Sequence, residues 1–242
     1  MITHMDGIVG DVLDVVAELG LDNETLVVFT SDNGASNQGG HSYQYFDDSG
    51  PLRGAKGCTW EGGFREPFLI RWPHHVPAGR RSAVPWAAYD ILPTFLEAAG
   101  APTSAVPAGV QGRSVLDLFL GKNESEPRLL YWKFGLGCQG VADYNPPHQY
   151  PHCCDYAFAA RQGNWKVRWW SNPHVPVQLY DLASDIHEDT NVYAASAANK
   201  ATADAMMQEA RAAYDVADPF WPDTPCTTTG TTPLDGPCEG NE

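Results

Sequence analysis

The stretches TLVVFTSDNG (25–34) and PLRGAKGCTWEGGFREP (51–67) decide how the rest of this sequence is interpreted. The first contains four consecutive apolar residues, 26–29, followed by Ser-Asp-Asn-Gly. This pattern is typical of a strand that is buried on both faces, as in a parallel sheet. Asp32 and Asn33 would then follow the carboxyl end of the strand, which is the edge where ligands bind in open α/β sheets.

Asp32 and Asn33 together offer one carboxylate and one amide carbonyl. Hard oxygen donors of this kind suit calcium or magnesium better than zinc or copper. Asp-Asn-Gly is also a strong turn sequence, because Asn and Gly tolerate positive φ and Asp bonds its own backbone. The residues alone therefore leave two interpretations open, a metal site and a turn.

The second stretch is locally basic in an acidic protein. The formal net charge is -15, and residues 1–50 contain nine acids but neither Lys nor Arg. Residues 51–81, in contrast, hold six cations against two acids. Lys56 lies among several glycines, so we expect a loop wrapped round a small anion such as sulfate or phosphate. Solvated surface cations that pair with nearby acids are the alternative.

Four segments, taken in order, resemble the formylglycine-dependent sulfatases, the arylsulfatase family. A strand that ends in SDNG comes first, and LRGxKGxxxEGGxREP follows about twenty residues later. YDILPTFLEAAG (89–100) and LYDLASDIHEDTNV (179–192) are similar to later parts of the family sequence. The resemblance runs from about residue 1 to residue 192, and it corresponds to the second half of the catalytic domain and the subdomain that follows.

The resemblance implies roles for three residues. In the family, the Asp and Asn after the strand bind a calcium ion, and the Lys of the Gly-rich loop contacts the sulfate ester. By position these residues are Asp32, Asn33 and Lys56. The resemblance also implies a secreted or lysosomal sulfuric ester hydrolase that acts on aryl or carbohydrate sulfates.

One part of the family pattern is missing. The family nucleophile is a formylglycine made from Cys or Ser in a C/S-x-P-x-R motif, and none of the six cysteines here lies in that motif. Residues 49–53 match its five-residue core, but they fall inside the Lys56 loop, and we interpret the match as coincidence. Further metal and sulfate ligands also lie upstream in the family. We therefore expect a truncated chain that is inactive by itself.

Two alternatives belong to other functional classes. The first is a non-catalytic remnant that binds anions or sulfated glycans. The second is a phosphoryl-transfer enzyme of the related alkaline-phosphatase-like superfamily, against which the EGGxREP segment argues.

Composition excludes some partners. The acidic balance argues against nucleic acid, whose binding depends on Lys and Arg neutralising phosphates. No apolar run approaches the roughly 20 residues of a membrane span, and no signal peptide is recognisable at Met1. The six cysteines, and glycosylation sequons at Asn23 and Asn123, favour a disulfide-bonded glycoprotein in an oxidising compartment.

The predicted fold class is α/β, a partial alkaline-phosphatase-like sulfatase fold. Residues 1–125 are expected to form part of the catalytic domain, a mostly parallel sheet flanked by helices that include residues 5–19. Residues 126–216 contain four short strand patterns and an alanine-rich helix pattern, which predict a small antiparallel sheet covered by a helix. Residues 217–242 are expected to form an irregular Cys/Pro/Thr-rich tail.

Several other groups are weaker candidates for a site. His41 could line a pocket mouth, whereas Asp90 is better explained as a helix cap. The aromatic residues of the second domain could stack on a sugar or aryl ring, but strand aromatics are more often part of a core; they are Trp132, Tyr144, Tyr150, Trp165, Trp169 and Trp170. One His/Cys group fits no standard zinc spacing, which favours a disulfide loop; it comprises His148, His152, Cys153 and Cys154.

Overall fold

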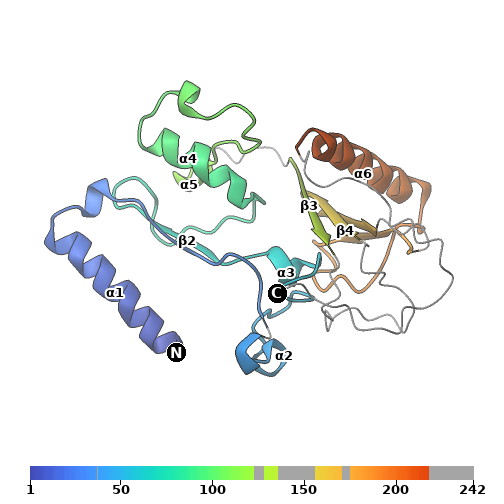
Figure 1. Ribbon diagram of the computed structural model, residues 1–242, viewed down its shortest axis with the longest axis horizontal. Coiled ribbons are helices and arrows are strands. Elements are labelled where there is room, and N and C mark those ends of the chain that lie inside the picture. The colour runs from blue at the N-terminus through green and yellow to red at the C-terminus, as the bar shows by residue number, and fades with distance from the viewer. Residues whose placement is uncertain (37, 123–127, 136–155, 171–174, 218–242) are drawn as a thin grey trace, which may run out of the picture. The chain divides into compact units, whose positions relative to one another are not determined.

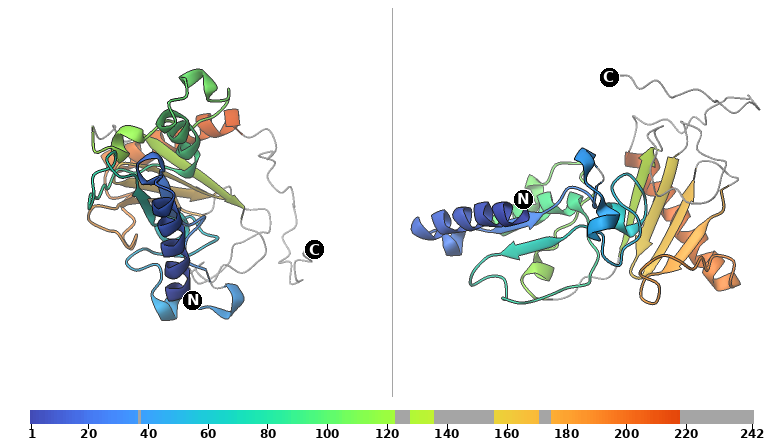
Figure 2. Two further views of the ribbon diagram at one scale, coloured as in Figure 1. Left: turned by 90° about the vertical axis from the view of Figure 1, so that its left-hand side faces the viewer. Right: turned by 90° about the horizontal axis from the view of Figure 1, so that it is seen from below.

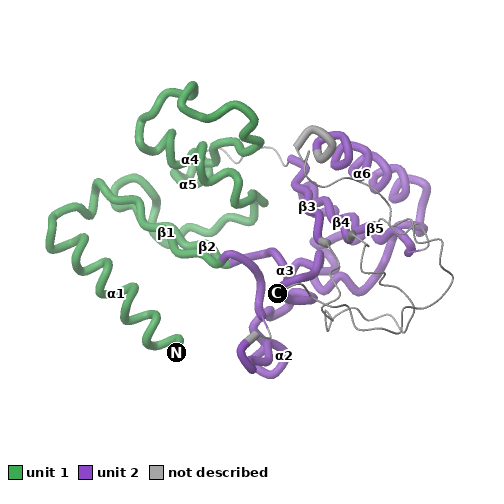
Figure 3. Tube along the Cα trace, viewed as in Figure 1, with its two compact units in different colours: residues 1–31, 67–126 green, residues 32–66, 127–242 purple. Residues whose placement is uncertain are grey.

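The computed structural model describes residues 1–36, 38–122, 128–135, 156–170 and 175–217. The chain divides into two compact units, which Figure 3 distinguishes by colour. Unit 1 comprises residues 1–31 and 67–126, and unit 2 comprises residues 32–66 and 127–242. The segment 32–66, which contains the candidate site residues Asp32, Asn33 and Lys56, therefore belongs to the same unit as the C-terminal sheet.

Some sequence-based expectations concern residues outside the described ranges. They are the sequon at Asn123, the aromatic residues Tyr144 and Tyr150, the His/Cys group at 148–154, and the tail from residue 218 onward with Cys226 and Cys238.

Unit 1 consists of helices and one pair of strands (Figure 1). Its elements are α1 (Ile2–Glu18), η1 (Asp22–Glu24), β1 (Val27–Thr30), β2 (Phe68–Arg71), η3 (Ala88–Asp90), α4 (Ile91–Ala98), η4 (Thr103–Ala105) and α5 (Leu116–Phe119). The helix expected at residues 5–19 is confirmed as α1. It ends where Gly20 adopts a positive φ of 69°, a conformation that glycine accepts without strain.

The strand expected at residues 26–29 is present, but its pairing differs from the prediction. β1 pairs antiparallel with β2, so that Val27 lies opposite Arg71 and Thr30 lies opposite Phe68. Its first three side chains are half-buried and Thr30 is exposed, so the strand is not buried on both faces. The mostly parallel sheet is therefore not found among the described residues. A short apolar run carries no information about the direction of its partner, so the parallel pairing is not confirmed.

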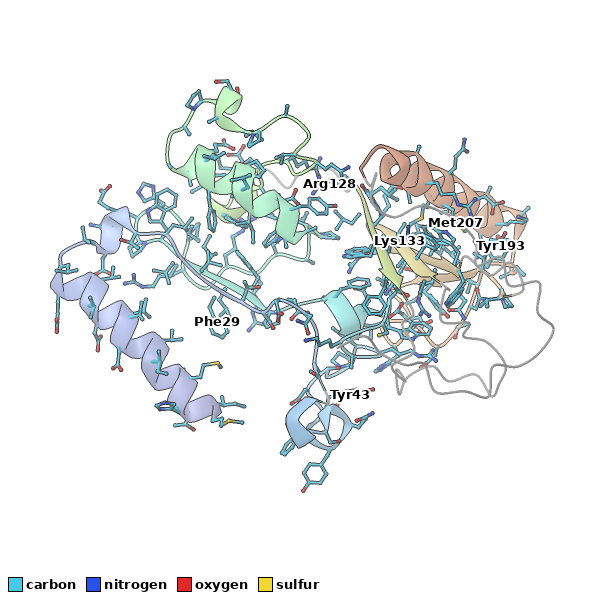
Figure 4. All side chains as sticks on the ribbon, in the orientation of Figure 1. Phe29, Tyr43, Arg128, Lys133, Tyr193 and Met207 are labelled. Atoms are coloured by element: carbon cyan, nitrogen blue, oxygen red, sulfur yellow. The ribbon has the colours of Figure 1, made fainter. Side chains whose placement is uncertain are left out.

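The core of unit 1 lies where α5 packs beneath β2. Val115, Leu118 and Phe119 are buried there, and Phe68 stacks with Phe119 at a ring distance of 5.4 Å. α1, in contrast, contains no buried residue, although its apolar residues recur at helical spacing. Figure 4 shows its side chains standing clear of the ribbon along the length of the helix.

Unit 2 contains a four-stranded antiparallel sheet in the order β3-β4-β5-β6. Its strands are β3 (Leu129–Gly135), β4 (Tyr156–Gln162), β5 (Trp165–Trp170) and β6 (Gln178–Asp181), and its longest helix is α6 (Ala197–Ala217). Figure 2 shows α6 lying along one face of this sheet. The small antiparallel sheet with a covering helix is therefore confirmed.

The two faces of this sheet differ in chemistry because side chains alternate along each strand. On the α6 face, Val167 and Leu179 form an apolar core with Met206 and Met207. Figure 4 labels Met207 of this core. On the other face, Arg161 lies opposite Lys166, and Lys166 lies opposite Tyr180 in the next strand. A polar row therefore crosses the sheet on the face away from α6.

The segment 38–66 supplies three further short elements, η2 (Gln38–Gly40), α2 (Tyr43–Phe46) and α3 (Glu61–Phe64). α3 lies beside the sheet in both Figure 1 and Figure 2. None of the helices within the described ranges is both long enough and apolar enough to cross a membrane.

Candidate sulfate-binding loop and its support

The residues that directly follow the first segment's strand, 32–35, contact the Gly-rich loop within unit 2. The Lys56 N–H donates to the carbonyl of Ala35 at 2.7 Å, and the Gly34 N–H donates to the carbonyl of Gly63 at 3.0 Å. These two bonds join the chain just after Asp32 and Asn33 to two points of the Gly-rich loop, Lys56 and Gly63. The structure therefore brings together the backbones of the three predicted site residues.

Gly34 and two glycines of the loop, Gly54 and Gly62, allow close backbone packing. A Cβ on Gly34 would lie 1.8 Å from the carbonyl oxygen of Gly62, and a Cβ on Gly62 would lie 2.4 Å from that of Gly54. Gly54 also has a φ of 81°, which side-chain-bearing residues rarely adopt. The glycines thus allow the loop to fold onto itself and onto residue 34, rather than simply clearing room for an anion.

Lys56 and Asp32 are exposed and Asn33 is half-buried, so all three can reach a ligand from solvent. The oxygen atoms of Asp32 and Asn33 are of the type that calcium prefers. Calcium takes about six to eight oxygen ligands, however, and two residues do not complete such a set. Within the described ranges no group of three or more His, Cys, Asp or Glu side chains is arranged to hold a metal ion.

A buried charge cluster lies beneath the loop. Lys166 Nζ lies 2.7 Å from Glu188 Oε1 and 3.2 Å from Glu61 Oε1, and all three side chains are fully buried. Arg161 Nη1 lies 2.5 Å from the other oxygen of Glu61. The second oxygen of Glu188 accepts the backbone N–H of Glu61 at 2.8 Å. Glu188 therefore has two partners and Glu61 has three, because Arg65 Nη1 also lies 3.8 Å from Glu61 Oε2. Such pairing is the condition under which charges can be buried.

A second polar contact ties the start of the loop to the same place. Arg53 Nη1 donates to the carbonyl of Glu188 at 2.8 Å. The guanidinium groups of Arg53 and Arg168 lie 3.9 Å and 3.3 Å from the ring centre of Trp60, which is buried. Arg168 also donates to the Thr59 hydroxyl at 3.1 Å. Cation–π contacts and hydrogen bonds therefore hold the loop on both sides of Lys56.

Burial perturbs the titration of several groups in this region. It lowers the pKa of Lys166, a shift that Glu188 and Glu61 oppose. It also lowers the pKa of Arg168 to about 10 and raises the pKa of Tyr180 to about 12. Burial raises the pKa of the Cys58 thiol, although Cys58 lies in the loop. Because the thiolate is the nucleophilic form, Cys58 is unsuited to attack a substrate at neutral pH.

Aromatic rings border the loop on the β3 side. The Phe134 ring would be 3.7 Å from a Cβ placed on Gly57, the residue after Lys56, and Phe134 is 38% exposed. Phe64 of α3 stacks on Trp132 of β3 at a ring distance of 4.1 Å. Phe134 therefore presents a partly exposed ring within reach of the loop that carries Lys56.

Comparisons with known proteins agree with these features. A family model described as Sulfatase matches residues 1–101. A second, described as N-sulphoglucosamine sulphohydrolase, C-terminal, matches residues 55–213, which is more than half of the chain. The chain belongs to the sulfatase family.

Individual sulfatases resemble this chain over different lengths. Human arylsulfatase A is 32% identical over 213 residues, which cover 78% of this chain and 37% of the relative. Mouse steryl-sulfatase is 39% identical over 149 residues, which cover 60% of this chain and 23% of the relative. The chain thus spans less than two fifths of the length of either relative.

Solved structures extend the likeness to the fold. The crystal structure of Ps i-CgsB in complex with k-i-k-neocarrahexaose superposes with a TM-score of 0.70 at 29% identity, covering 91% of this chain and 43% of that one. The predicted α/β sulfatase fold is therefore confirmed at the level of the family, while the described strands pair only antiparallel.

Sequence reasoning missed the charge cluster of this sulfatase chain. Glu61 and Glu188 are 127 positions apart, so no local pattern joins them. The available signal was in β5, where Lys166 and Arg168 alternate with the core residues Val167 and Trp169. Cations at every second position of a tryptophan-rich strand indicate a charged face that another segment must cover.

Two other candidates have structural partners. His41 pairs with Asp48 and stacks on Phe46 at 4.8 Å, all within the segment that contains α2. Asp90 is buried and accepts the N–H groups of Ala87 at 3.0 Å and Arg113 at 2.8 Å. Asp90 therefore caps backbone N–H groups at the start of this helical segment, as the sequence predicts.

Proposed function

We propose that this chain carries part of the substrate site of a sulfuric ester hydrolase of the arylsulfatase type. Lys56 is the residue that contacts the sulfate ester, both in binding it and in stabilising charge during the reaction. The single observation that carries this proposal is the 2.7 Å bond between the Lys56 N–H and the Ala35 carbonyl, in a chain of the sulfatase family. That bond fixes Lys56 beside the segment that contains Asp32 and Asn33.

Asp32 and Asn33 are proposed to supply two ligands of a calcium ion. Their carboxylate and amide oxygens have the chemistry that calcium requires, and the remaining ligands have to come from elsewhere. A bound calcium ion would act as a Lewis acid toward the ester. This chain would hold the two ligand oxygens on a segment that is bonded to the Lys56 loop, because the Gly34 N–H donates to the Gly63 carbonyl.

The complete reaction in the family is the formylglycine mechanism. Covalent catalysis requires an activated nucleophile, and none of the six cysteines lies in a C-x-P-x-R motif. We therefore propose that this polypeptide alone binds sulfate esters without hydrolysing them. A non-catalytic protein that binds anions or sulfated glycans would share this behaviour, and Lys56 would serve it in the same way.

Further assignments follow from the family. The substrate is proposed to be an aryl or carbohydrate sulfate, because the partly exposed Phe134 ring near Gly57 offers a surface for an organic ring. Residues 1–125 are assigned to the catalytic α/β domain, 126–216 to the C-terminal subdomain and 217–242 to a tail. The proposed location is secreted or lysosomal, with disulfides and N-linked glycans.

Calorimetry with the full chain tests this function. Inorganic sulfate and 4-nitrophenyl sulfate are titrated into the wild type, Lys56→Ala and Lys122→Ala, where Lys122 is an exposed lysine paired with Asp117. Loss of one charge-assisted bond, about 1.5–3 kcal/mol, weakens binding roughly 10- to 150-fold in Lys56→Ala alone. Equal affinities for all three proteins would refute the role of Lys56, and release of 4-nitrophenol by the wild type would refute its inactivity.

A further inference from the structure

We propose that Lys166, together with Glu61 and Glu188, is a positioning device that holds the Lys56 loop in its sulfate-binding conformation. The proposal rests on the proposed function of Lys56. It assigns to the C-terminal sheet a part in the site, although Lys166 itself is fully buried and touches no ligand.

The contacts form a continuous path from the sheet to the loop. Lys166 of β5 binds the side chain of Glu61, the first residue of α3, and Glu188 binds the backbone N–H of the same residue. The loop is then closed on itself, because the Gly62 N–H donates to the Arg53 carbonyl at 2.7 Å. Arg53 in turn donates to the Glu188 carbonyl at 2.8 Å. Glu188 is therefore bonded to both ends of the loop.

Lys56 lies within this closed loop, between two points that are held. Cys58 Sγ donates to the Ala55 carbonyl at 2.9 Å, which makes a tight turn around residues 55–58. A Cβ on Gly63 would lie 2.3 Å from the Cys58 carbonyl oxygen, so the turn packs directly on α3. A shift of α3 therefore displaces the turn that presents Lys56.

The chemistry of the cluster fits positioning better than stabilisation alone. Buried ion pairs are often no more stabilising than well-packed apolar residues of similar volume. They do require one arrangement of donors and acceptors, because a displaced carboxylate loses its partner in a medium that solvates it poorly. Phe64 adds to this requirement, since its ring centre lies 4.5 Å from Lys166 Nζ. The position of α3 on the sheet is thereby fixed.

Hydrogen exchange tests this positioning role of Lys166, Glu61 and Glu188 independently of sulfate binding. The full-length wild type is compared with Lys166→Met, with the milder Glu188→Gln, and with Lys200→Met, which removes an exposed lysine paired with Asp204. In the first two variants we expect the exchange rates of the amides of residues 53–65 to increase at least tenfold more than those of the amides of α6 and β3. Unchanged exchange in the loop, or an equal increase in all segments, would overturn the proposal. If Lys166→Met does not fold, Glu188→Gln decides.

A double-mutant cycle then tests whether the charge cluster affects sulfate binding through Lys56. Sulfate affinity is measured for Glu188→Gln, Lys56→Ala and the double variant. If Glu188 positions Lys56, then Glu188→Gln weakens binding about fivefold or more in the wild type and has no further effect in Lys56→Ala. Independent, additive losses would contradict the proposal. A wild type that binds no sulfate refutes the function of Lys56. In that case the exchange experiment alone decides whether the charge cluster holds the loop in place.

Discussion

Lys166 Nζ and Glu188 Oε1 lie 2.7 Å apart, and neither side chain is exposed to solvent. Lys166 belongs to β5, whereas Glu188 lies in the segment after β6 and also binds the N–H of Glu61. This pair joins the sheet of unit 2 to the Gly-rich loop. Lys166 also pairs with a second carboxylate, that of Glu61. Loss of any one of these charges therefore leaves another buried charge with one partner fewer.

Removal of the central cation should destabilise unit 2. In Lys166→Met, Glu61 and Glu188 are left as buried carboxylates without the cation between them, and loss of one partner of a buried pair costs about 3–5 kcal/mol. Urea unfolding followed by circular dichroism measures the change. Lys200→Met should cost less than about 1 kcal/mol, because its ion pair with Asp204 is exposed. Similar losses for both variants would contradict the account.

Gly34 should not tolerate a side chain. The Cβ of Gly34→Ala would lie 1.8 Å from the Gly62 carbonyl oxygen, so the loop must separate from residue 34. We expect a lower unfolding midpoint and weaker sulfate binding. Gly7→Ala is the matched control, since Gly7 lies in α1 with nothing within 4 Å of its added Cβ, and alanine favours a helix by about 1 kcal/mol. A Gly34→Ala protein as stable as the wild type would disprove the close approach.

Tyr180 should make unit 2 sensitive to alkali. Burial raises the pKa of Tyr180 to about 12, although the positive charges of Arg168 and Arg53 oppose this shift. A raised pKa stabilises the fold fully below the unfolded value of 10.0, and this contribution is lost as pH rises from about 10 to about 12. The difference in unfolding free energy between the wild type and Tyr180→Phe should therefore be constant up to pH 9.5. At higher pH the unfolding free energy of the wild type should fall relative to that of Tyr180→Phe. A constant difference up to pH 11.5 would contradict the shift.

Phe134 should discriminate between sulfate esters and free sulfate. Its ring is partly exposed near Gly57 and can stack on an aryl or sugar ring but not on inorganic sulfate. Phe134→Ala is expected to weaken 4-nitrophenyl sulfate binding roughly five- to tenfold, in line with about 1 kcal/mol for an aromatic contact, and to leave inorganic sulfate unaffected. Tyr45→Ala, at an exposed ring of α2, serves as the control. Equal weakening of both ligands would exclude a stacking role.

Local patterns predicted the elements of this chain well. Alternation and turn residues predicted the four strands of unit 2, helical periodicity predicted α1 and a high alanine content predicted α6, because each signal depends on neighbours within a few positions. The parallel pairing expected for β1 is not confirmed, for the opposite reason. Its partner β2 follows the long segment 32–66, and an apolar run of four residues is compatible with either direction.

The candidate site was predictable only where its residues form motifs. Asp32, Asn33 and Lys56 were proposed because they lie in two short conspicuous stretches, and the structure joins those stretches by backbone bonds. The charge cluster that supports the loop was not predicted. It depends on Lys166 and Glu188, whose relation to Glu61 exists only after the sheet has formed.

A crystal structure of the full chain grown with calcium and sulfate tests the central claim most directly. The account predicts a sulfate oxygen about 2.7–3.2 Å from Lys56 Nζ, with Asp32 and Asn33 facing the same small volume. The Lys166 cluster should be unchanged beneath the loop. Sulfate bound elsewhere, with these three side chains directed into separate regions, would contradict the account.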